Sequence, residues 1–373
     1  MDRPAGRYAA TLDFCVARTR ENLGRLDGFP HTTRGGRWRT SEHGRWTAGH
    51  WVGTVWLAHL WSGDPVLADA ARAWAERLAP RQHDTTTHDM GFLFWPSFVR
   101  GHRLTGDAWY RDAAVTAARS LATRFHPEGG YIQAWEEAED PAHAGRAIVD
   151  TVMNLPLLLW AADETGDARL REIALAVAET TAAEHVRPDG STWHVVDFDP
   201  ATGAPRRRGT HQGLHDASFW SRGQAWATDG FASVGRMAGR DDLRAVGART
   251  GDFFAARLTP GVAPPWDFAA TGDGEPRDAA AGAIAATGFL DLARSAGDPA
   301  ERARWAQRAG DLLDTLVATC SGAADPAAEG LLLHATADRP RNSAVDESLA
   351  YGDHYFFEAL LRAERPDLVE PLL

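Results

Sequence analysis

Two aspartates in this sequence stand just ahead of long apolar stretches, where an acid is unexpected. Asp150 lies in AIVDTVMNLPLLLWAADETGD (147–167), and Asp89 lies in THDMGFLFWPSF (87–98). Each could cap the helix that follows, because Asp favours the position before a first turn. Two carboxyl groups at the heads of neighbouring helices are also what general acid and base catalysis on a sugar requires. The apolar and aromatic surroundings of both acids favour this second interpretation.

Polar and aromatic residues gather in two further stretches. One, RWTAGHWVGTVWLAHLW (45–61), carries Trp residues at the head of another apolar segment. The other, residues 191–230, mixes His, Gln, Arg and Trp in a segment that looks like a long connection. Such mixtures are typical of a ligand pocket with apolar walls and a few polar groups. The candidate residues that accompany the two aspartates are Trp46, His88, Trp135, His194, Gln212, Trp220, Arg222 and Trp226.

Tryptophan is unusually frequent in this chain. There are 15 Trp residues against 5 Tyr residues. An indole is costly to bury because its N–H needs a hydrogen-bond partner. The excess therefore favours a cleft lined with indoles, of the kind that stacks on sugar rings.

Composition limits the possible partners. The 373 residues are 44% hydrophobic and 24% charged, which is typical of a globular protein with a sizeable core. The formal net charge is −12 and no basic run occurs, so we expect no nucleic acid or membrane-surface partner. An anionic substrate would need a local positive charge.

The N-terminal segment and the cysteines bear on location. The first residues, MDRPAGRYAATLDFCVARTRENL, are charged throughout and have no signal-peptide apolar core. No apolar run approaches the length of a membrane span. We expect Cys15 and Cys320 to be buried thiols, with a single disulfide as the alternative. These features favour a cytoplasmic protein.

Helical periodicity dominates the chain, and short Gly–Asp turns separate successive helices. The pattern predicts twelve helices, because Gly can end one helix in the left-handed conformation and Asp can cap the next. The turns are SGDP (62–65), TGDA (105–108), TGDA (165–168), AGRDD (238–242) and AGDP (296–299). The predicted helices span 8–25, 49–62, 65–79, 91–104, 107–124, 151–164, 167–185, 221–238, 241–257, 278–295, 299–319 and 346–363.

Repeated helical hairpins predict the fold class, an all-α (α/α)6 toroid. The last helix would close against the first, and no linker divides the chain, so we expect a single domain over residues 1–373. Inner helices would alternate with outer ones, with short turns on one face of the ring. The long connections would lie on the other face, and the candidate site should lie there. These connections are 26–48, 80–90, 125–150, 186–220, 258–277 and 320–345.

Several motifs resemble those of one enzyme family. The chain is similar to the unsaturated glucuronyl hydrolases of glycoside hydrolase family 88, in order from about residue 45 to residue 362. A sister group, the unsaturated rhamnogalacturonyl hydrolases, shares the fold and the acids, but SRGQAW fits the glucuronyl group better. The motifs are THDMGF, DTVMNLPLLLWA, TWH…FDPATG, THQG…SFWSRGQAWA, PPWDF and DESLAYGDHYFFEALLR.

The resemblance implies an unusual hydrolysis that needs no cofactor or metal. The substrate would be an unsaturated oligosaccharide, usually a disaccharide, left by a polysaccharide lyase. The enzyme would hydrate the C4=C5 bond of the terminal uronate, with Asp150 as the general acid and base and Asp89 as its partner. Asp150 must then be protonated, so burial or a nearby like charge must raise its pKa. The chain would act as a monomer or a homodimer.

The same resemblance implies roles for the other candidates. His88, His194, Gln212 and Arg222 would contact the uronate ring, with Arg222 forking the carboxylate. Trp46, Trp135, Trp220 and Trp226 would be stacking walls, although core packing is an equal alternative for each. The loop 334–348 is where relatives would accommodate the second sugar, and Arg341 and Ser343 could accept an anion there. We interpret Asp278 as structural, and His83, His211 and His215 as loop residues.

Three alternatives remain open on the sequence alone. An inverting glycosidase on the same toroid would also need two acids, although Glu is its usual proton donor. A metal site could form from His83, His88 and Asp89, or from His211, His215 and Asp216, but neither set has a recognised zinc spacing. A sugar-binding protein without catalysis is the third alternative. An Asp150→Asn variant separates a binder, which would lose little, from an enzyme.

Overall fold

The structure is a computed structural model and describes residues 6–135 and 144–373. All twelve predicted helical segments are present, with ends shifted by a few residues. The predicted connection 125–150 lies partly outside the described residues. The helices are α1 Ala9–Leu23, α2 Ala48–Ser62, α3 Pro65–Leu78, α4 Met90–Phe94, α5 Arg100–Thr105, α6 Ala108–Ala122, α7 Leu155–Thr165, α8 Ala168–His185, α9 Ser221–Ala238, α10 Asp241–Ala255, α11 Ala279–Ser295, α12 Pro299–Cys320, α13 Ala350–Glu364 and α14 Pro366–Val369.

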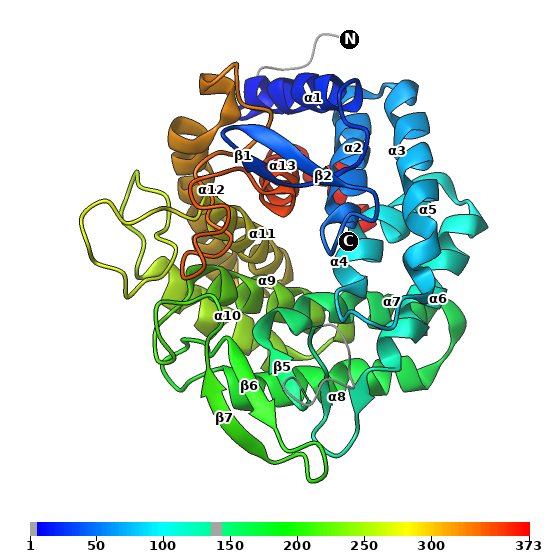
Figure 1. The fold of residues 1–373 in the computed structure, drawn as a ribbon, viewed down its shortest axis with the longest axis vertical. Coiled ribbons are helices and arrows are strands. Elements are labelled where there is room, and N and C mark those ends of the chain that lie inside the picture. The colour runs from blue at the N-terminus through cyan, green and yellow to red at the C-terminus, as the bar shows by residue number, and fades with distance from the viewer. Residues whose placement is uncertain (1–5, 136–143) are drawn as a thin grey trace.

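The helices form two concentric rings (Figure 1). Helices α2, α4, α7, α9, α11 and α13 contact one another in this order, and α13 contacts α2, which closes the inner ring. Helices α1, α3, α6, α8, α10 and α12 pack outside them. The inner helices are apolar on nearly all sides because they are covered by both rings. The predicted (α/α)6 toroid is confirmed.

Three of the five Gly–Asp turns have the expected geometry. Each glycine is left-handed, with φ between 70° and 72°. Each aspartate accepts a hydrogen bond from the backbone N–H two residues later, which caps the next helix. The pairs are Gly63–Asp64, Gly106–Asp107 and Gly166–Asp167.

The other two turns differ from the prediction. Gly239 is left-handed, but Arg240 precedes α10 and no side chain caps that helix. The prediction for Gly297 is wrong, because α11 ends at Ala296 in an extended conformation. Asp298 nevertheless caps α12 as predicted.

The second inner helix is broken where the sequence predicts one helix over 91–104. A π-helical turn, Trp95–Val99, separates α4 from α5. Pro96 lies in this turn, and a proline inside a helix lacks the N–H that the regular pattern needs. The wider turn accommodates that missing hydrogen bond.

Small antiparallel sheets lie on the long-connection face. β1 Phe29–Arg34 pairs with β2 Arg37–Ser41, and β3 Phe125–His126 pairs with β4 Tyr131–Ile132. The third sheet contains β5 Arg146–Ile148, β6 Val195–Phe198 and β7 Pro205–Gly209. The predicted start of the last helix at 346 is wrong, because the residues before Ala350 pair with a strand. Residues 347–349 are extended there, and the Ser348 carbonyl accepts a hydrogen bond from the Thr33 N–H.

Two properties of the described residues complete the fold. Cys15 and Cys320 are buried free thiols, as expected. Among residues 6–135 and 144–373, no helix combines the length and the apolar composition needed to cross a membrane.

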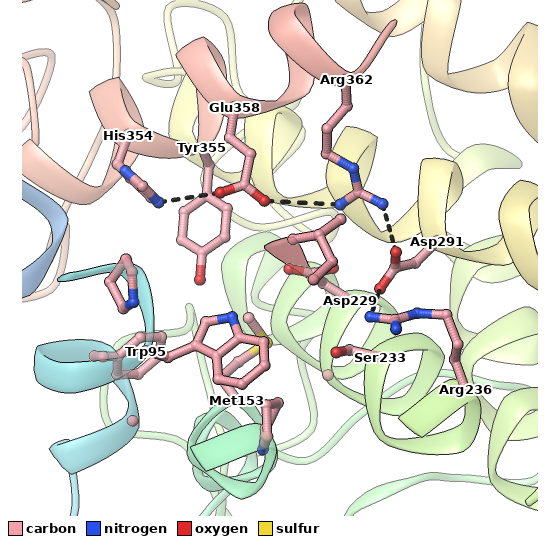
Figure 2. A pocket seen from close by; sticks show the side chains of 16 residues that line it. Trp95, Met153, Asp229, Ser233, Arg236, Asp291, His354, Tyr355, Glu358 and Arg362 are labelled. Atoms are coloured by element: carbon pink, nitrogen blue, oxygen red, sulfur yellow. Dashed lines mark hydrogen bonds and ion pairs between the residues drawn. The ribbon is translucent and has the colours of Figure 1, made fainter. Parts of the chain in front are cut away.

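A buried network of ion pairs ties the second halves of the inner helices together (Figure 2). Arg362 of α13 pairs with Asp291 of α11 and lies 3.8 Å from Glu358. Glu358 also pairs with Arg100, at the start of α5. A cavity of about 40 Å³ adjoins the network, and Asp229 of α9 lines it.

Replacing Arg362 should strongly destabilise the toroid. An Arg362→Met variant leaves two buried carboxylates without this partner, which typically costs about 3–5 kcal/mol of the free energy of unfolding. Urea unfolding followed by circular dichroism measures the change. Arg365→Met is the matched control, because Arg365 pairs with Asp367 on the surface and its loss should matter far less. Equal unfolding midpoints for the two variants would contradict the structural role of the network.

Candidate active site

Asp150 lies in a short helix that the β-sheet sets in place. The segment Val149–Asn154 is a 3-10 helix directly after β5 and directly before α7. Strand β5 pairs with β6, and the Val149 N–H donates to the carbonyl of His194, 3.0 Å away. This pairing brings Asp150 and His194 to the same part of the long-connection face.

The carboxyl group of Asp150 does not cap a helix. The residue before the 3-10 helix is Ile148, and no side-chain capping bond forms there. Oδ1 of Asp150 is buried and accepts no hydrogen bond within the described part of the chain. A buried polar atom without a hydrogen bond costs free energy, and a capping carboxylate would have accepted one from a helix N–H. The capping alternative for Asp150 is therefore wrong.

The surroundings of Asp150 favour its protonated form. Burial, and then the negative charge of Asp89, raise the pKa of Asp150 to about 7. Arg222 acts in the opposite direction but more weakly. A raised pKa of this kind is what the sequence-based assignment of Asp150 as the acid requires, and the assignment itself stays a prediction.

Asp89 stands at the head of α4, the inner helix next to α7. It precedes the helix but makes no capping bond. One carboxylate oxygen accepts a hydrogen bond from the Thr87 hydroxyl at 3.0 Å. The other lies 3.5 Å from Nε2 of His88. The side chain is 14% exposed, so this carboxylate retains contact with solvent.

His88 contacts both Asp89 and Trp135. The backbone N–H of Trp135 donates to Nδ1 of His88 at 3.1 Å. Nδ1 is thus an acceptor, and the proton of a neutral ring lies on Nε2, facing Asp89. Trp135 has a left-handed backbone, with φ of 58°, and its ring lies 4.5 Å from the ring of His211.

His194 and Trp220 form the wall beside Asp150. Their ring centroids are 4.3 Å apart. Nδ1 of His194 accepts backbone N–H groups of His211 and Gln212, at 3.2 and 3.4 Å. Burial holds the pKa of His194 well below its usual value, so the ring is neutral at physiological pH. A neutral imidazole adds no charge that would lower the pKa of Asp150.

The side chains of Arg222 and Gln212 form hydrogen bonds within the protein, whereas the sequence analysis expected them to face the substrate. Arg222 is 2% exposed, and its terminal nitrogens bind Asp278 and the carbonyls of Thr336 and Ala337. Gln212 donates to the Ala337 carbonyl at 2.8 Å. The expected fork for a substrate carboxylate is therefore occupied in this structure. Both side chains hold the loop 334–348 against the site.

Asp278 and Arg341 extend this arrangement. Asp278 caps α11 and pairs with Arg222, which confirms its structural interpretation. Arg341 binds Asp338 and the carbonyl and ring nitrogen of His211. His211 thus touches both Trp135 and the loop 334–348. The sequence analysis interpreted His211 as a loop residue, and its position directly before the candidate Gln212 in THQG is the signal that could have indicated these contacts.

The two remaining candidate tryptophans, Trp46 and Trp226, are buried to different extents. Trp46 is partly exposed and packs on Tyr351, with centroids 4.8 Å apart. Trp226 is 1% exposed and packs on Phe92 and Tyr355, so it lies in the core beneath the site and not on its wall. Tyr351 is also 1% exposed, but the charges of Arg222 and Asp150 act on it, so it lies beneath the acid; the sequence analysis missed it although the motif DESLAYGDHYFF contains it.

The structure does not assemble the metal alternatives. Within residues 6–135 and 144–373, no group of three or more His, Cys, Asp or Glu side chains could hold a metal ion. Asp216, one proposed ligand, instead binds Arg207 and the Thr210 N–H. The geometry of the described residues therefore gives this alternative no support.

Fold and site together define a class of protein. A toroid with a protonated acid, a second carboxylate and aromatic walls on its long-connection face has the parts of a glycoside hydrolase. Residues 27–240 match the sequence profile of Glycosyl Hydrolase Family 88. The chain belongs to this family and is a glycoside hydrolase.

Individual relatives agree with the family assignment. The unsaturated glucuronyl hydrolase of Bacillus sp. (strain GL1) is 36% identical over 94% of each chain. The unsaturated chondroitin disaccharide hydrolase of Streptococcus pyogenes serotype M1 is 32% identical, over 94% of this chain and 90% of that protein. A crystal structure of unsaturated glucuronyl hydrolase from Bacillus sp. GL1 superposes with a TM-score of 0.90 at 34% identity, covering 95% of this chain and 96% of the other.

Proposed function

We propose that this enzyme removes the unsaturated uronate from the non-reducing end of oligosaccharides made by polysaccharide lyases, by hydrating its C4=C5 bond. One observation carries the proposal. Asp150 has a buried carboxyl oxygen without a hydrogen-bond partner among the described residues, and its pKa is raised to about 7. A carboxyl group of this kind can donate a proton at neutral pH.

The reaction then proceeds through protonation of the double bond, addition of water and opening of the ring. Asp150 donates its proton to C4, and the positive charge that forms at C5 is shared with the ring oxygen. A water molecule adds to C5 and gives its proton to the Asp150 carboxylate, which restores the acid. The hemiketal at C5 opens to a C5 ketone, which leaves C1 as a hemiacetal. This hemiacetal collapses to an aldehyde as the bond from C1 to the leaving sugar breaks, and the proton of the C1 hydroxyl passes to the departing oxygen. None of these steps needs a nucleophile from the protein at the anomeric carbon.

Asp89 has two roles in this proposal. Its charge raises the pKa of Asp150, and its exposed oxygen is available to sugar hydroxyls. Trp46, Trp135 and Trp220 line the site with apolar surface that suits the faces of sugar rings. The names of the relatives, which mention unsaturated glucuronyl groups and an unsaturated chondroitin disaccharide, support this substrate class.

The proposal predicts loss of the substrate double bond and an acidic pH dependence. With unsaturated chondroitin or hyaluronan disaccharide, the ultraviolet absorbance of the C=C bond should decay as product forms. Because the pKa of Asp150 is raised to about 7, activity should be full below this pH and fall as the pH rises through it. Unchanged absorbance with new reducing ends would instead indicate an inverting glycosidase. A rate that stays constant above pH 8 would contradict Asp150 as the acid.

A further inference from the structure

The heads of the two acid-bearing helices are joined by one amide side chain, that of Asn154. This residue ends the 3-10 helix that carries Asp150 and directly precedes α7. It is 0% exposed and makes no capping bond to its own helix. Its Oδ1 instead accepts the backbone N–H of Phe92, in the first turn of α4, at 3.1 Å. Phe92 lies three residues after Asp89 on that helix.

The second contact of Asn154 reaches back to the acid itself. Its Nδ2 lies 3.5 Å from the carbonyl oxygen of Asp150. The amide therefore needs both of its halves, an acceptor toward α4 and a donor toward the Asp150 segment. No other residue of similar size offers both with this geometry.

Gly91 shows how closely the two backbones approach at this point. A Cβ atom at Gly91 would lie 2.4 Å from Cα of Asn154 and 2.8 Å from its Oδ1. Both atoms are closer than real Cβ contacts allow, and one belongs to the backbone. Gly91 therefore permits direct backbone contact between the second residue after Asp89 and Asn154, the residue that ends the Asp150 segment.

The charges around the pair make their separation important. Asp150 is influenced by Asp89 from the head of α4 and by Arg222 from α9, and its own charge helps to raise the pKa of Tyr351 of α13. Asp89 is in turn near His88 and Arg124. The interaction of two charges falls with distance, so a change in the separation of the acids changes how firmly Asp150 holds its proton.

We propose that Asn154 is a positioning residue that fixes the separation of the Asp89 and Asp150 carboxyl groups by bonding both helix heads. The inference rests on the proposed roles of the two acids. Without the amide, the like charges are free to move apart, and the site loses the pair that keeps the acid protonated. Gly91 serves the same arrangement by removing steric bulk at the contact.

Two substitutions at Asn154 should shift the pH profile in opposite directions. Asn154→Ala removes the link, so the basic limb of kcat/KM should move to lower pH by about half a unit or more, while kcat falls about tenfold or more. Asn154→Asp keeps the acceptor for Phe92 and adds a negative charge, which helix N-termini stabilise. Its basic limb should move to higher pH. The measurement is the decay of substrate absorbance from pH 4 to pH 9.

The matched control is Asn22→Ala in α1. Asn22 is also buried and also bonds a backbone carbonyl, that of Glu329, but it is far along the chain from both acids. The Asn22→Ala variant should be less stable than the wild type, but its pH profile of kcat/KM should be the same. Profiles of the Asn154 variants that superpose on the wild-type profile after scaling would overturn the proposal, because a merely structural asparagine would behave in that way. If Asn154→Ala does not fold, Asn154→Ser takes its place, because the Ser side chain is too short to bond both helix heads; a basic limb that stays at the wild-type pH would then overturn the proposal.

A double substitution separates this inference from the function on which it rests. In an Asp89→Asn background the charge that Asn154 positions is absent, so adding Asn154→Ala should not move the basic limb further. If Asp89→Asn shifts the limb and Asn154→Ala does not, only the role of Asn154 fails. If neither wild type nor variants consume the double bond, the proposed function fails.

Discussion

Asp150→Asn should lower kcat for an unsaturated disaccharide by roughly 10³- to 10⁴-fold, which is the size of a lost general acid and base. Asn cannot donate a proton to C4 or accept one from water, so both halves of the reaction lose their catalyst. The amide is nearly isosteric with the neutral carboxyl group that the site maintains. We therefore expect KM to change by less than about threefold.

The control for this prediction is a buried aspartate outside the site. Asp229 lines the cavity beside the ion network, and burial also raises its pKa well above the usual value (Figure 2). Asp229→Asn should keep most of the activity, since its carboxyl group faces the ion network. Decay of the substrate absorbance gives the rates, and inhibitor or substrate binding by calorimetry gives the affinity. Near wild-type turnover of Asp150→Asn would refute its assignment as the acid.

The fold could be predicted because its signals are local. A left-handed glycine followed by a capping aspartate acts within a few residues, and Gly63–Asp64 shows the geometry directly. The errors arose where tertiary contacts override the local pattern. The extended residues ahead of α13 pair with β1, and the turn at Gly297 is set by the end of α11.

The site could be predicted only as far as residue identity. Asp89 and Asp150 were recognisable because each is embedded in apolar and aromatic sequence, which a cap on a solvated helix end does not need, and because the hairpin order makes their helices neighbours in the ring. The sequence did not indicate that the Arg222 side chain bonds other residues of the protein. Its partners, Asp278 and the carbonyl of Ala337, are 56 and 115 residues away, and no local pattern announces a buried ion pair at that separation.

The same limit applies to aromatic residues. Trp46 and Trp226 look alike in the sequence, since both lie near the start of a helix and close to polar residues. Only the packing of Phe92 and Tyr355 around Trp226 places that ring in the core. Depth within the toroid depends on how far along an inner helix a residue lies and on which side of the ring it faces.

Asp89→Asn should move the basic limb of kcat/KM to lower pH by at least about one unit. The negative charge of Asp89 is the second-largest cause of the raised pKa of Asp150, after burial. Once that charge is removed, only burial opposes the nearby Arg222, which favours the ionised form of Asp150. At neutral pH less of the enzyme then carries the proton, so the loss of activity should be greatest there and smaller at pH 5.

The shape of this pH dependence distinguishes an electrostatic partner from a simple substrate contact. If Asp89 only held sugar hydroxyls, its amide variant would raise KM equally at every pH. Asp84→Asn provides the control, because Asp84 lies on the same connection but binds Arg81 and Thr86. Its basic limb should stay where the wild-type limb lies. A basic limb of Asp89→Asn that also stays in place would mean that burial alone keeps Asp150 protonated, and that the second acid serves binding only.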